Sequence, residues 1–425
     1  MTIRPARKFR GRFALPGDKS ISHRLALFGA VAFGETKARN FSEAADCQST
    51  LSCLEGLGVR VVREPGSVTV YGQGFEGLRA PRRPLDAGNS GSTLRMLSGI
   101  LAGRPFKAVI TGDDSLRRRP VERVAAPLRA MGARLDSADG HAPLSIQGGS
   151  LRGIDWELSV ASAQVKTAVL LAGLQAEGRT SVSEPHRSRD HTERLLPAFG
   201  VALERDANRV ALRGGARLQG GQFTVPGDAS SAAFLVVAAV LVPDSEVRIE
   251  GVSLNPGRTA FLDVLREMGA SLEVTATQLE PEPVGTIVAR SSSLRGVHIP
   301  PDVVPALIDE IPALAVAGAV ARGSLEIRGA EELRVKESDR IATLLDGLRR
   351  MGASVEERQD GLTVHGGSRL HGASVRSYGD HRIAMALAVA GLVAEGETTI
   401  EGAECVAVSF PGFFDRLADA TGTHA

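Results

Sequence analysis

Basic and hydroxyl residues gather at six places in the chain where an apolar, helix-forming run begins. These starts read GDKSISHR, GNSGSTLR, ASAQVKTA, GDASSAAF, ALIDEIPA and YGDHRIAM, and they recur about every 70 residues. A helix N-terminus offers unpaired N–H groups and the positive end of a dipole, so several such ends favour an anionic ligand. The charged residues in or near them are mostly basic, namely Lys19, Arg24, Arg95, Lys166 and Arg382. The starts therefore predict a binding site for small anions.

Arginine is also concentrated in two further segments. LRRRP contributes Arg117, Arg118 and Arg119, and RVKESDR contributes Arg334, Lys336 and Arg340. A guanidinium can bind phosphate or carboxylate through two parallel hydrogen bonds, which suits an anion site. Most arginines are solvated surface charges, and that alternative stays open for these segments. It fits Lys19, Arg95 and Arg382 poorly, because each opens or interrupts an otherwise apolar helix.

Carboxylates occur where general acid–base chemistry could use them. Asp309 and Glu310 interrupt the apolar run VVPALIDEIPALAVAGAV, where a buried carboxylate is costly unless it is paired. Glu337 and Asp339 lie among the cations of RVKESDR. A carboxylate and a lysine in one cleft can divide the work of acid and base. A structural salt-bridge network explains the same pattern, and the residues alone do not decide between the two.

Other chemistries find little support. The nine histidines form no H-E-x-x-H spacing, and Cys47, Cys53 and Cys405 match no common zinc pattern. No P-loop or dinucleotide fingerprint is present, so the motifs support neither a P-loop nucleotide site nor a dinucleotide cofactor. His381 is either a catalytic base or a hydrogen-bonding partner of its neighbour Asp380.

The composition of the chain limits its partners. Its 425 residues carry 50 Lys and Arg against 49 Asp and Glu, a net charge of +1, which gives no reason to expect nucleic acid or an anionic membrane. No apolar run reaches the roughly 18 residues of a spanning helix, and the basic N-terminus lacks the apolar core of a secretory signal. Three cysteines fit a reducing compartment. We expect a cytoplasmic, globular monomer of roughly two to three domains.

The six starts belong to six α/β units. In each unit a second, more charged helical run ends before a glycine and a strand-like stretch follows. We expect the left-handed conformation that closes a helix at Gly58, Gly132, Gly200, Gly269, Gly352 and Gly422. The Ala-rich helices should be buried in the middle of a domain, with the charged helices outside. The N-caps of the Ala-rich helices are expected at Ser20, Ser92, Ser162, Ser230, Asp309 and Asp380. Six such units predict two domains of three.

Seven motifs occur in the order and spacing of one known family: LPGDKSISHR (15–24), LDAGNSGSTLR (85–95), RRRPVERV (117–124), ASAQVKTAVLLAG (161–173), PGDASSAAF (226–234), LRVKESDR (333–340) and DHRIAMALAV (380–389). On these motifs the whole chain resembles the 5-enolpyruvylshikimate-3-phosphate synthases, also called 3-phosphoshikimate 1-carboxyvinyltransferases. The SAQVK form is similar to the branch called class II. The resemblance implies an α/β fold of two inverse α/β barrels, each with three βαβαββ repeats. It implies a discontinuous domain I of residues 1–17 plus 227–425, a domain II of 18–226, and an active site in the interdomain cleft.

The resemblance also implies a reaction. The enolpyruvyl group moves from phosphoenolpyruvate to the 5-hydroxyl of shikimate 3-phosphate, a step toward chorismate and the aromatic amino acids, and phosphate is released. Protonation of C3 and attack of the hydroxyl at C2 give a tetrahedral ketal phosphate, which then eliminates phosphate. No metal or organic cofactor takes part. The herbicide glyphosate is expected to occupy the phosphoenolpyruvate pocket against Gly91.

Individual roles follow from the same resemblance. It assigns catalysis to Asp309 as base at the 5-hydroxyl, to Glu337 as proton donor and acceptor at the methylene carbon, and to Lys19. The shikimate 3-phosphate site is implied to contain Lys19, Ser20, Arg24, Ser162, Ala163, Gln164, Arg189, Asp309 and Lys336. The phosphoenolpyruvate site is implied to contain Lys19, Gly91, Arg119, Gln164, Arg340 and Arg382, with Asn89 shaping the loop.

Two positions depart from the pattern, and two alternatives remain. Val408 stands where some members have a lysine, and EPHRSRDHTE lacks the Ser-Lys-Pro-Tyr form, so Arg189 is inferred there as the phosphate contact. A sister transferase acting on UDP-N-acetylglucosamine would have a reactive loop cysteine and a Lys-Asn pair where this chain has Lys19-Ser20. A non-catalytic anion-binding protein would not need Asp309 and Glu337 together.

Overall fold

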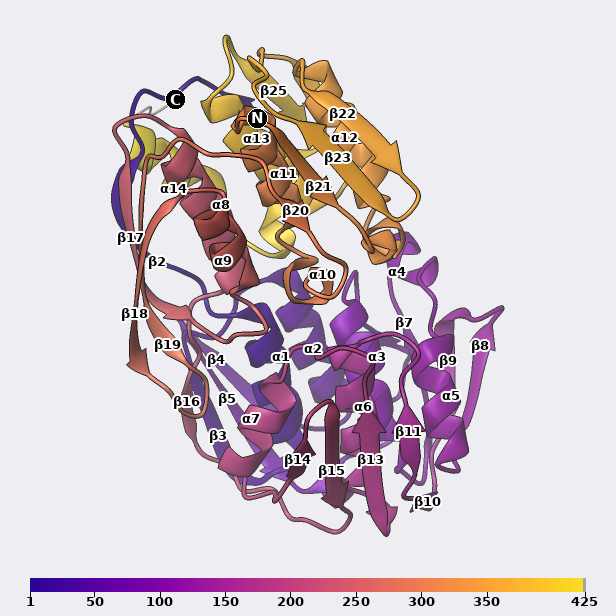
Figure 1. Cartoon of the computed structure of the whole chain (residues 1–425). Helices are drawn as coiled ribbons and strands as arrows, with labels where there is room; N and C mark the ends of the chain where they lie inside the picture. Colours follow the sequence, from indigo (N-terminus) through magenta and orange to yellow (C-terminus); the bar gives the residue numbers. More distant parts are fainter. Residues whose placement is uncertain (423–425) are drawn as a thin grey trace. The chain divides into compact units, whose positions relative to one another are not determined.

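The computed structural model describes residues 1–422 and divides into two units. Unit 1 comprises Met1–Pro16, Pro226–Leu279 and Pro283–Ala425, and unit 2 comprises Gly17–Val225 and Glu280–Glu282. Each unit has its own hydrophobic core. In Figure 1 the indigo N-terminal segment runs with the orange and yellow part of the chain, so unit 1 is discontinuous in sequence. That residues 1–17 plus 227–425 and residues 18–226 are the two folding domains of the chain stays a prediction.

One sheet pattern recurs five times in the described residues. The first strand is parallel to the second, and the second and third are each antiparallel to the next. Unit 2 contains β16-β3-β5-β4 (Gln222–Thr224, Phe33–Arg39, Ser67–Gln73, Arg60–Glu64), β6-β7-β9-β8 (Leu85–Asp86, Lys107–Thr111, His141–Gln147, Arg134–Ala138) and β11-β13-β15-β14 (Asp155–Glu157, Arg179–Ser183, Arg209–Arg213, Glu204–Asp206). Unit 1 contains β2-β17-β19-β18 (Arg10–Ala14, Glu246–Ser253, Val284–Arg290, Ser271–Gln278) and β20-β21-β23-β22 (His298–Ile299, Ser324–Ile327, Gly361–His365, Ser354–Arg358).

The remaining strands complete the two units. A three-stranded sheet joins β24 (Ser374–Arg376), β25 (Thr398–Glu401) and β1 (Thr2–Ile3), with β24 parallel and β1 antiparallel to β25. Strand β1 from the start of the chain thus takes the third place in this sheet. A short parallel pair joins β10 (Leu151–Arg152) and β12 (Ala176–Glu177). The structure is therefore a mixed α/β protein.

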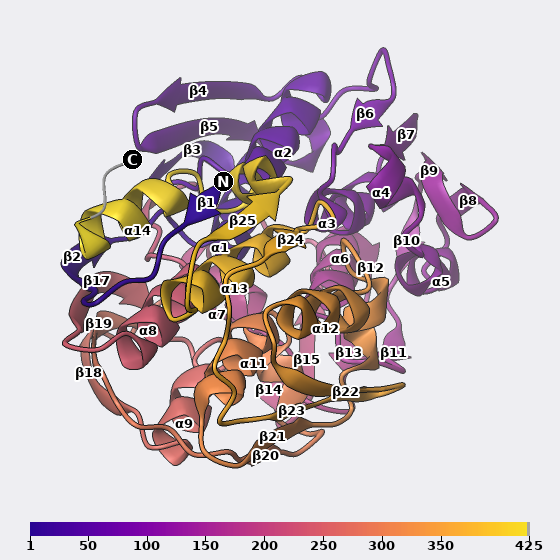
Figure 2. The ribbon, with the colours of Figure 1, turned by 90° about the horizontal axis from the view of Figure 1, so that it is seen from above.

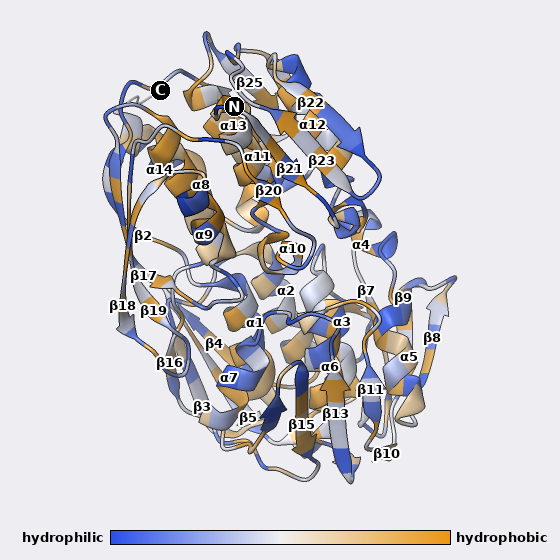
Figure 3. Ribbon diagram, in the orientation of Figure 1, coloured by the Kyte–Doolittle hydropathy of each residue, from blue (hydrophilic) through white to orange (hydrophobic). Residues whose placement is uncertain are grey.

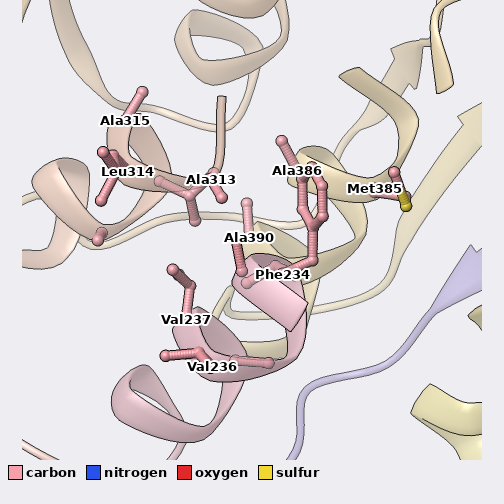
Figure 4. Packing of buried hydrophobic residues seen from close by; sticks show 14 of the residues in the cluster. Phe234, Val236, Val237, Ala313, Leu314, Ala315, Met385, Ala386 and Ala390 are labelled. Atoms are coloured by element: carbon pink, nitrogen blue, oxygen red, sulfur yellow. The ribbon is translucent and has the colours of Figure 1, made fainter. Parts of the chain in front are cut away.

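The Ala-rich helices are buried almost all round, as predicted. They are α1 (Lys19–Val31), α3 (Gly91–Ala102), α6 (Ala163–Gly173), α8 (Ala229–Leu241), α11 (Ile311–Val320) and α13 (His381–Leu392). Helix α13 is buried at every position. In unit 1, α8, α11 and α13 pack on one another, and Figure 2 shows them within the strands of that unit. Figure 3 shows α8 and α11 largely in hydrophobic colours, and Figure 4 shows side chains of this cluster, among them Phe234, Ala313 and Ala386.

The more charged helices have one buried face. They are α2 (Ala45–Gly56), α5 (Glu122–Ala130), α7 (His191–Ala198), α9 (Ala260–Glu267), α12 (Arg340–Arg350) and α14 (Phe413–Thr421). Short helical turns complete the list: α4 (Asp114–Arg117), α10 (Val304–Leu307), η1 (Phe75–Gly77), η2 (Glu331–Val335) and η3 (Ala403–Val408). In α9 the buried side chains are Phe261, Leu262, Val264 and Leu265, the spacing of an amphipathic helix. Within residues 1–422 no helix is long and apolar enough to span a bilayer.

The predicted helix-ending glycines are confirmed. The φ angles of Gly58, Gly132, Gly200, Gly269, Gly352 and Gly422 lie between 71° and 114°. A residue with a Cβ rarely adopts that conformation, so glycine is the residue that lets each chain segment turn from helix to strand.

The predicted N-caps are only partly correct. Ser162 and Asp380 cap α6 and α13, accepting hydrogen bonds from the backbone N–H groups of Val165 and Arg382. In α1, α3 and α8 the caps lie two residues earlier than predicted, at Asp18, Ser90 and Asp228, and α11 begins after Glu310 with no side-chain cap. The error arises because each motif offers two cap-forming residues in one turn, and Ser20, Ser92 and Ser230 lie inside the helix instead.

Candidate active site

In unit 2, the candidate residues lie at the N-termini of α1, α3 and α6. Lys19 is the first residue of α1, and its Nζ lies 2.8 Å from Oδ2 of Asp46 in α2. The two side chains are 16% and 9% exposed. The pair fixes the ammonium at the positive end of α1, where it can attract a small anion.

Arg24 links α1 to α6 and α7. Its Nε donates to Oγ1 of Thr192 at 2.8 Å, and Nη2 donates to Oγ1 of Thr167 at 2.9 Å. Nη1 donates to the carbonyl of Ser20 at 2.9 Å. Burial lowers the pKa of Arg24 to about 10, against the raising effect of Glu193, so the guanidinium remains charged at neutral pH. Arg24 is thus a buried cation held by hydroxyls and carbonyls.

A second group surrounds the start of α3. Ser90 caps the helix, and Gly91 is its first residue. Arg119 is buried and donates from Nη2 to Oδ1 of Asn89 at 2.5 Å, so Asn89 orients this arginine beside the loop. A Cβ built on Gly91 would lie 2.7 Å from Nη1 of Arg95 and 3.5 Å from Nη1 of Arg119. Gly91 therefore lies against two guanidiniums.

Gln164 joins α6 to α3. Its Oε1 accepts from Nη1 of Arg95 at 2.8 Å, and its Nε2 donates to Oγ of Ser92 at 2.9 Å. Ser162 and Ala163 precede it at the helix start. The structure thus brings the predicted residues of 91–95 and 162–164 together within unit 2.

In unit 1, one guanidinium holds three carboxylates. Arg340, the first residue of α12, donates from Nε to Oδ2 of Asp380 at 2.7 Å and from Nη1 to Oδ1 of Asp309 at 3.1 Å. Its Nη2 donates to Oε2 of Glu337. Burial lowers the pKa of Arg340, but the charges of Asp380, Glu337 and Asp309 outweigh burial and raise it. The two predicted acid–base residues, Asp309 and Glu337, therefore share one partner.

Further cations surround this group. Arg382, in the first turn of α13, donates from Nη1 to the carbonyl of Asp309 at 3.0 Å. Lys336 lies 3.7 Å from Oε2 of Glu332, and burial lowers the pKa of its ammonium, opposed by Glu332 and Asp309. Val408, at the end of η3, is half-buried. His381 is buried at the start of α13, next to the N-cap Asp380.

Sequence reasoning missed the partners that hold these cations. Asp46 and Thr192 were not proposed, and Ser92 was proposed only as an N-cap. In the structure they bond the predicted site residues Lys19, Arg24 and Gln164, in that order for Asp46, Thr192 and Ser92. Their one-residue signals are weak, because serine, threonine and aspartate are common at helix starts for capping alone. Arg189 lies just before α7 and is half-buried. Within residues 1–422 no cluster of three or more His, Cys, Asp or Glu side chains is arranged to hold a metal ion; the expected lack of a cofactor stays a prediction.

Comparisons with known proteins agree along the whole chain. The family model described as EPSP synthase (3-phosphoshikimate 1-carboxyvinyltransferase) matches residues 3–417. A 3-phosphoshikimate 1-carboxyvinyltransferase of Brevibacillus brevis is 50% identical over 420 residues, 98% of this chain and 99% of the relative. That of Desulforamulus reducens is 51% identical over 423 residues, 99% of each chain. The solved structure of EPSP synthase from Acinetobacter baumannii superposes with a TM-score of 0.88 at 45% identity, covering 99% of this chain and 97% of that one.

Proposed function

The chain belongs to the EPSP synthase family and has its activity, the enolpyruvyl transfer from phosphoenolpyruvate to shikimate 3-phosphate in the shikimate pathway; we propose how its residues divide that work. Both substrates are small polyanions. Helix N-termini and buried guanidiniums are the groups that such ligands need.

Proton transfer is assigned to Asp309 and Glu337. Glu337 in its acid form gives a proton to C3 of phosphoenolpyruvate, while Asp309 takes the proton of the 5-hydroxyl as that oxygen bonds to C2. Glu337 then takes a proton back from C3 as the C2–O bond to phosphate breaks. The leaving phosphate takes up the proton held by Asp309, so both carboxyl groups return to their starting forms. The supporting observation is exposure: Asp309 and Glu337 are 16% and 19% exposed on Arg340, whereas Asp380 on the same guanidinium is 0% exposed. Only the first two can meet a substrate.

The arginines couple substrate binding to this chemistry. An anionic group of phosphoenolpyruvate competes with Asp309 and Glu337 for Arg340 and Arg382. Losing the guanidinium favours the protonated form of Glu337, which is the form that the first step requires. Lys336 is assigned to the shikimate side of the same group.

The anion contacts of unit 2 complete the proposal. Gly91 and Arg119 are assigned to phosphoenolpyruvate, and Lys19 and Gln164 to both substrates, with Lys19 also serving catalysis. Ser20 and Arg24 are assigned to the shikimate carboxylate, and Ser162, Ala163 and Arg189 to the 3-phosphate. The proximity of Gln164 to Arg95 and Ser92 supports one continuous site within the unit.

The larger-scale proposals follow from the family. We propose that units 1 and 2 are domains of three βαβαββ repeats each, in the arrangement of an inverse α/β barrel, with the substrates in the cleft between them. Five four-stranded sheets of one pattern, together with the three-stranded sheet β24-β25-β1 as a shorter sixth, support this repeat count. We further propose that the protein is a monomer of the bacterial cytoplasm and that it works without a metal ion or cofactor.

Glu337→Gln tests the catalytic assignment. Removing a positioned proton donor should lower kcat by about 10²–10⁴-fold. Calorimetric binding of shikimate 3-phosphate should change by only a few-fold, because glutamine still accepts from Arg340. Phosphate release with both substrates gives the rate. Glu357→Gln, which alters an exposed partner of Arg334 in the same unit, is the matched control and should keep full activity. If Glu337→Gln abolished the binding of shikimate 3-phosphate but the substrate that still bound were turned over at the normal rate, the proton-transfer role of Glu337 would be refuted.

A further inference from the structure

Unit 2 buries a lysine between two carboxylates. Lys166 lies in the first turn of α6, and its ammonium pairs with Oε1 of Glu184 and, at 2.6 Å, with Oε1 of Glu193. The three side chains are 4%, 3% and 8% exposed, in that order. Burial lowers the pKa of Lys166, but the two carboxylates outweigh burial and raise it, so the ammonium is charged at neutral pH.

Such a cluster is a poor source of stability. Desolvation of buried ions cancels much of their attraction, and well-packed apolar side chains often serve as well. An ion cluster instead fixes the positions of its members, because each charge determines where its partners must lie. The role of Lys166 therefore depends on the residues that Glu184 and Glu193 contact.

The first partner holds the backbone beside Arg189. Glu184 follows strand β13, and its Oε2 accepts from the backbone N–H of Ser188 at 3.2 Å. The backbone carbonyl of Asp190, on the other side of Arg189, accepts from the N–H of Arg194 at 3.0 Å. The backbone is thus bonded on both sides of Arg189, and Lys166 holds the bond on one of them.

The second partner lies in the first turn of α7, beside Arg24 and its hydroxyl partners. Glu193 follows Thr192, whose Oγ1 lies 2.6 Å from Oγ1 of Thr167 and accepts from Arg24. Burial is the main cause that lowers the pKa of Arg24, and the positive charge of Arg189 lowers it further, so the two guanidiniums are electrostatic neighbours. Helices α6 and α7 are therefore locked together around these cations.

We propose that Lys166 is a positioning residue for the 3-phosphate of shikimate 3-phosphate. Lys166, on α6, holds Glu184 and Glu193. It thereby sets Arg189 at the distance from the α6 N-terminus at which the guanidinium and the helix end face the same phosphate. This inference rests on the proposed function, which assigns Arg189 and residues 162–164 to that phosphate. Lys166 itself touches no substrate.

A substrate-specific test separates positioning from a structural role. Lys166→Met should raise the calorimetric Kd for shikimate 3-phosphate by about tenfold or more, a typical coupling between contacting residues. The KM for phosphoenolpyruvate at saturating shikimate 3-phosphate should change less than about threefold on the same reasoning. Lys166→Arg, which keeps the charge, should recover most of the affinity. Lys37→Met, which removes a lysine paired with Glu64 elsewhere in unit 2, is the control and should bind normally.

Two further variants keep the test decisive. If Lys166→Met does not fold, Glu184→Gln carries the test, because it keeps the shape and removes one charge. In the Arg189→Ala background, Lys166→Met should weaken binding no further, since it acts through Arg189. Normal binding by Arg189→Ala would overturn the proposed phosphate assignment and this inference with it. Weak binding by Arg189→Ala, with normal binding by folded Lys166→Met or Glu184→Gln, would overturn this inference alone.

Discussion

Several of the candidate cations are held by a carboxylate or carbonyl of the protein. Lys19 pairs with Asp46, Arg340 with Asp309 and Glu337, and Arg382 with the carbonyl of Asp309. These contacts orient a flexible side chain before a substrate arrives, which reduces the entropy lost on binding. The sequence predicted Lys19, Arg382 and Asp309 because charges inside apolar runs are conspicuous, and Glu337 and Arg340 because RVKESDR concentrates charges of both signs. It did not predict the pairs, because the partners are brought together by the fold.

Gly91→Ala should reduce glyphosate binding. The added methyl group would lie 2.7 Å from Nη1 of Arg95, so that side chain must shift, and the pocket assigned to phosphoenolpyruvate becomes narrower. We expect the glyphosate inhibition constant to rise by more than about tenfold, which is about 1.4 kcal/mol. The KM for phosphoenolpyruvate should rise less. Because Arg95 also bonds Gln164, affinity for shikimate 3-phosphate should fall a few-fold. An unchanged glyphosate constant would contradict the placement of Gly91.

The thiols should be inert at neutral pH. Burial raises the pKa of Cys53 to about 12 and that of Cys405 to about 11, and it raises the pKa of Cys47 as well. The thiolate is the reactive form, so iodoacetamide at pH 7.5 should neither add mass nor reduce activity. Rapid alkylation with loss of activity would instead support the sister-transferase chemistry, which uses a cysteine.

The same shifts give a pH dependence of stability. The folded thiols keep their protons at pH values where unfolded thiols, with a pKa of 9.0, have lost them. The unfolded state is then favoured, so the free energy of unfolding should fall as pH rises above about 9. Cys405→Ser should reduce that loss, measured by urea unfolding at pH 8 and pH 10.

At the scale of elements, helix ends were predictable where the signal is local. A glycine after an amphipathic run has one strong reason to be there, and all six such glycines have positive φ. Cap positions were less predictable, since Asp18 and Ser20 can both cap α1 and only the backbone geometry selects Asp18. Strand pairing was least predictable, because β1 and β25 lie at opposite ends of the chain.

Gly200→Ala isolates the cost of the left-handed helix ending. No atom lies within 4 Å of a Cβ built on Gly200 or on Gly149, but Gly200 has φ +85° and Gly149 is not in the left-handed region. Gly200→Ala should therefore destabilise unit 2 by about 1–2 kcal/mol, and Gly149→Ala should change stability by less than about 1 kcal/mol. Trp156, the single tryptophan, lies in β11 and reports the urea unfolding of unit 2. Equal midpoints for the two variants would contradict this account.

At the scale of the molecule, the two cores predict partly independent units. The hydrophobic cluster of unit 1 shares no residue with that of unit 2. The sequence predicted two groups of three repeats from the spacing of motifs alone. It could not predict that β1 completes the sheet of β24 and β25, because nothing in the short segment Thr2–Ile3 specifies a partner.

Substrate should draw the proposed domains together. The assigned cations are divided between the units, with Lys19, Arg24 and Arg119 in unit 2 and Arg340 and Arg382 in unit 1. A substrate anion that binds cations of both units at once favours hinge closure on binding. Small-angle scattering should show the radius of gyration falling toward about 22 Å, the value for a compact chain of this length, as shikimate 3-phosphate saturates. Shikimate without the phosphate, at equal concentration, should produce a smaller change. An unchanged radius at saturation, starting from a larger value, would show that binding does not close the hinge.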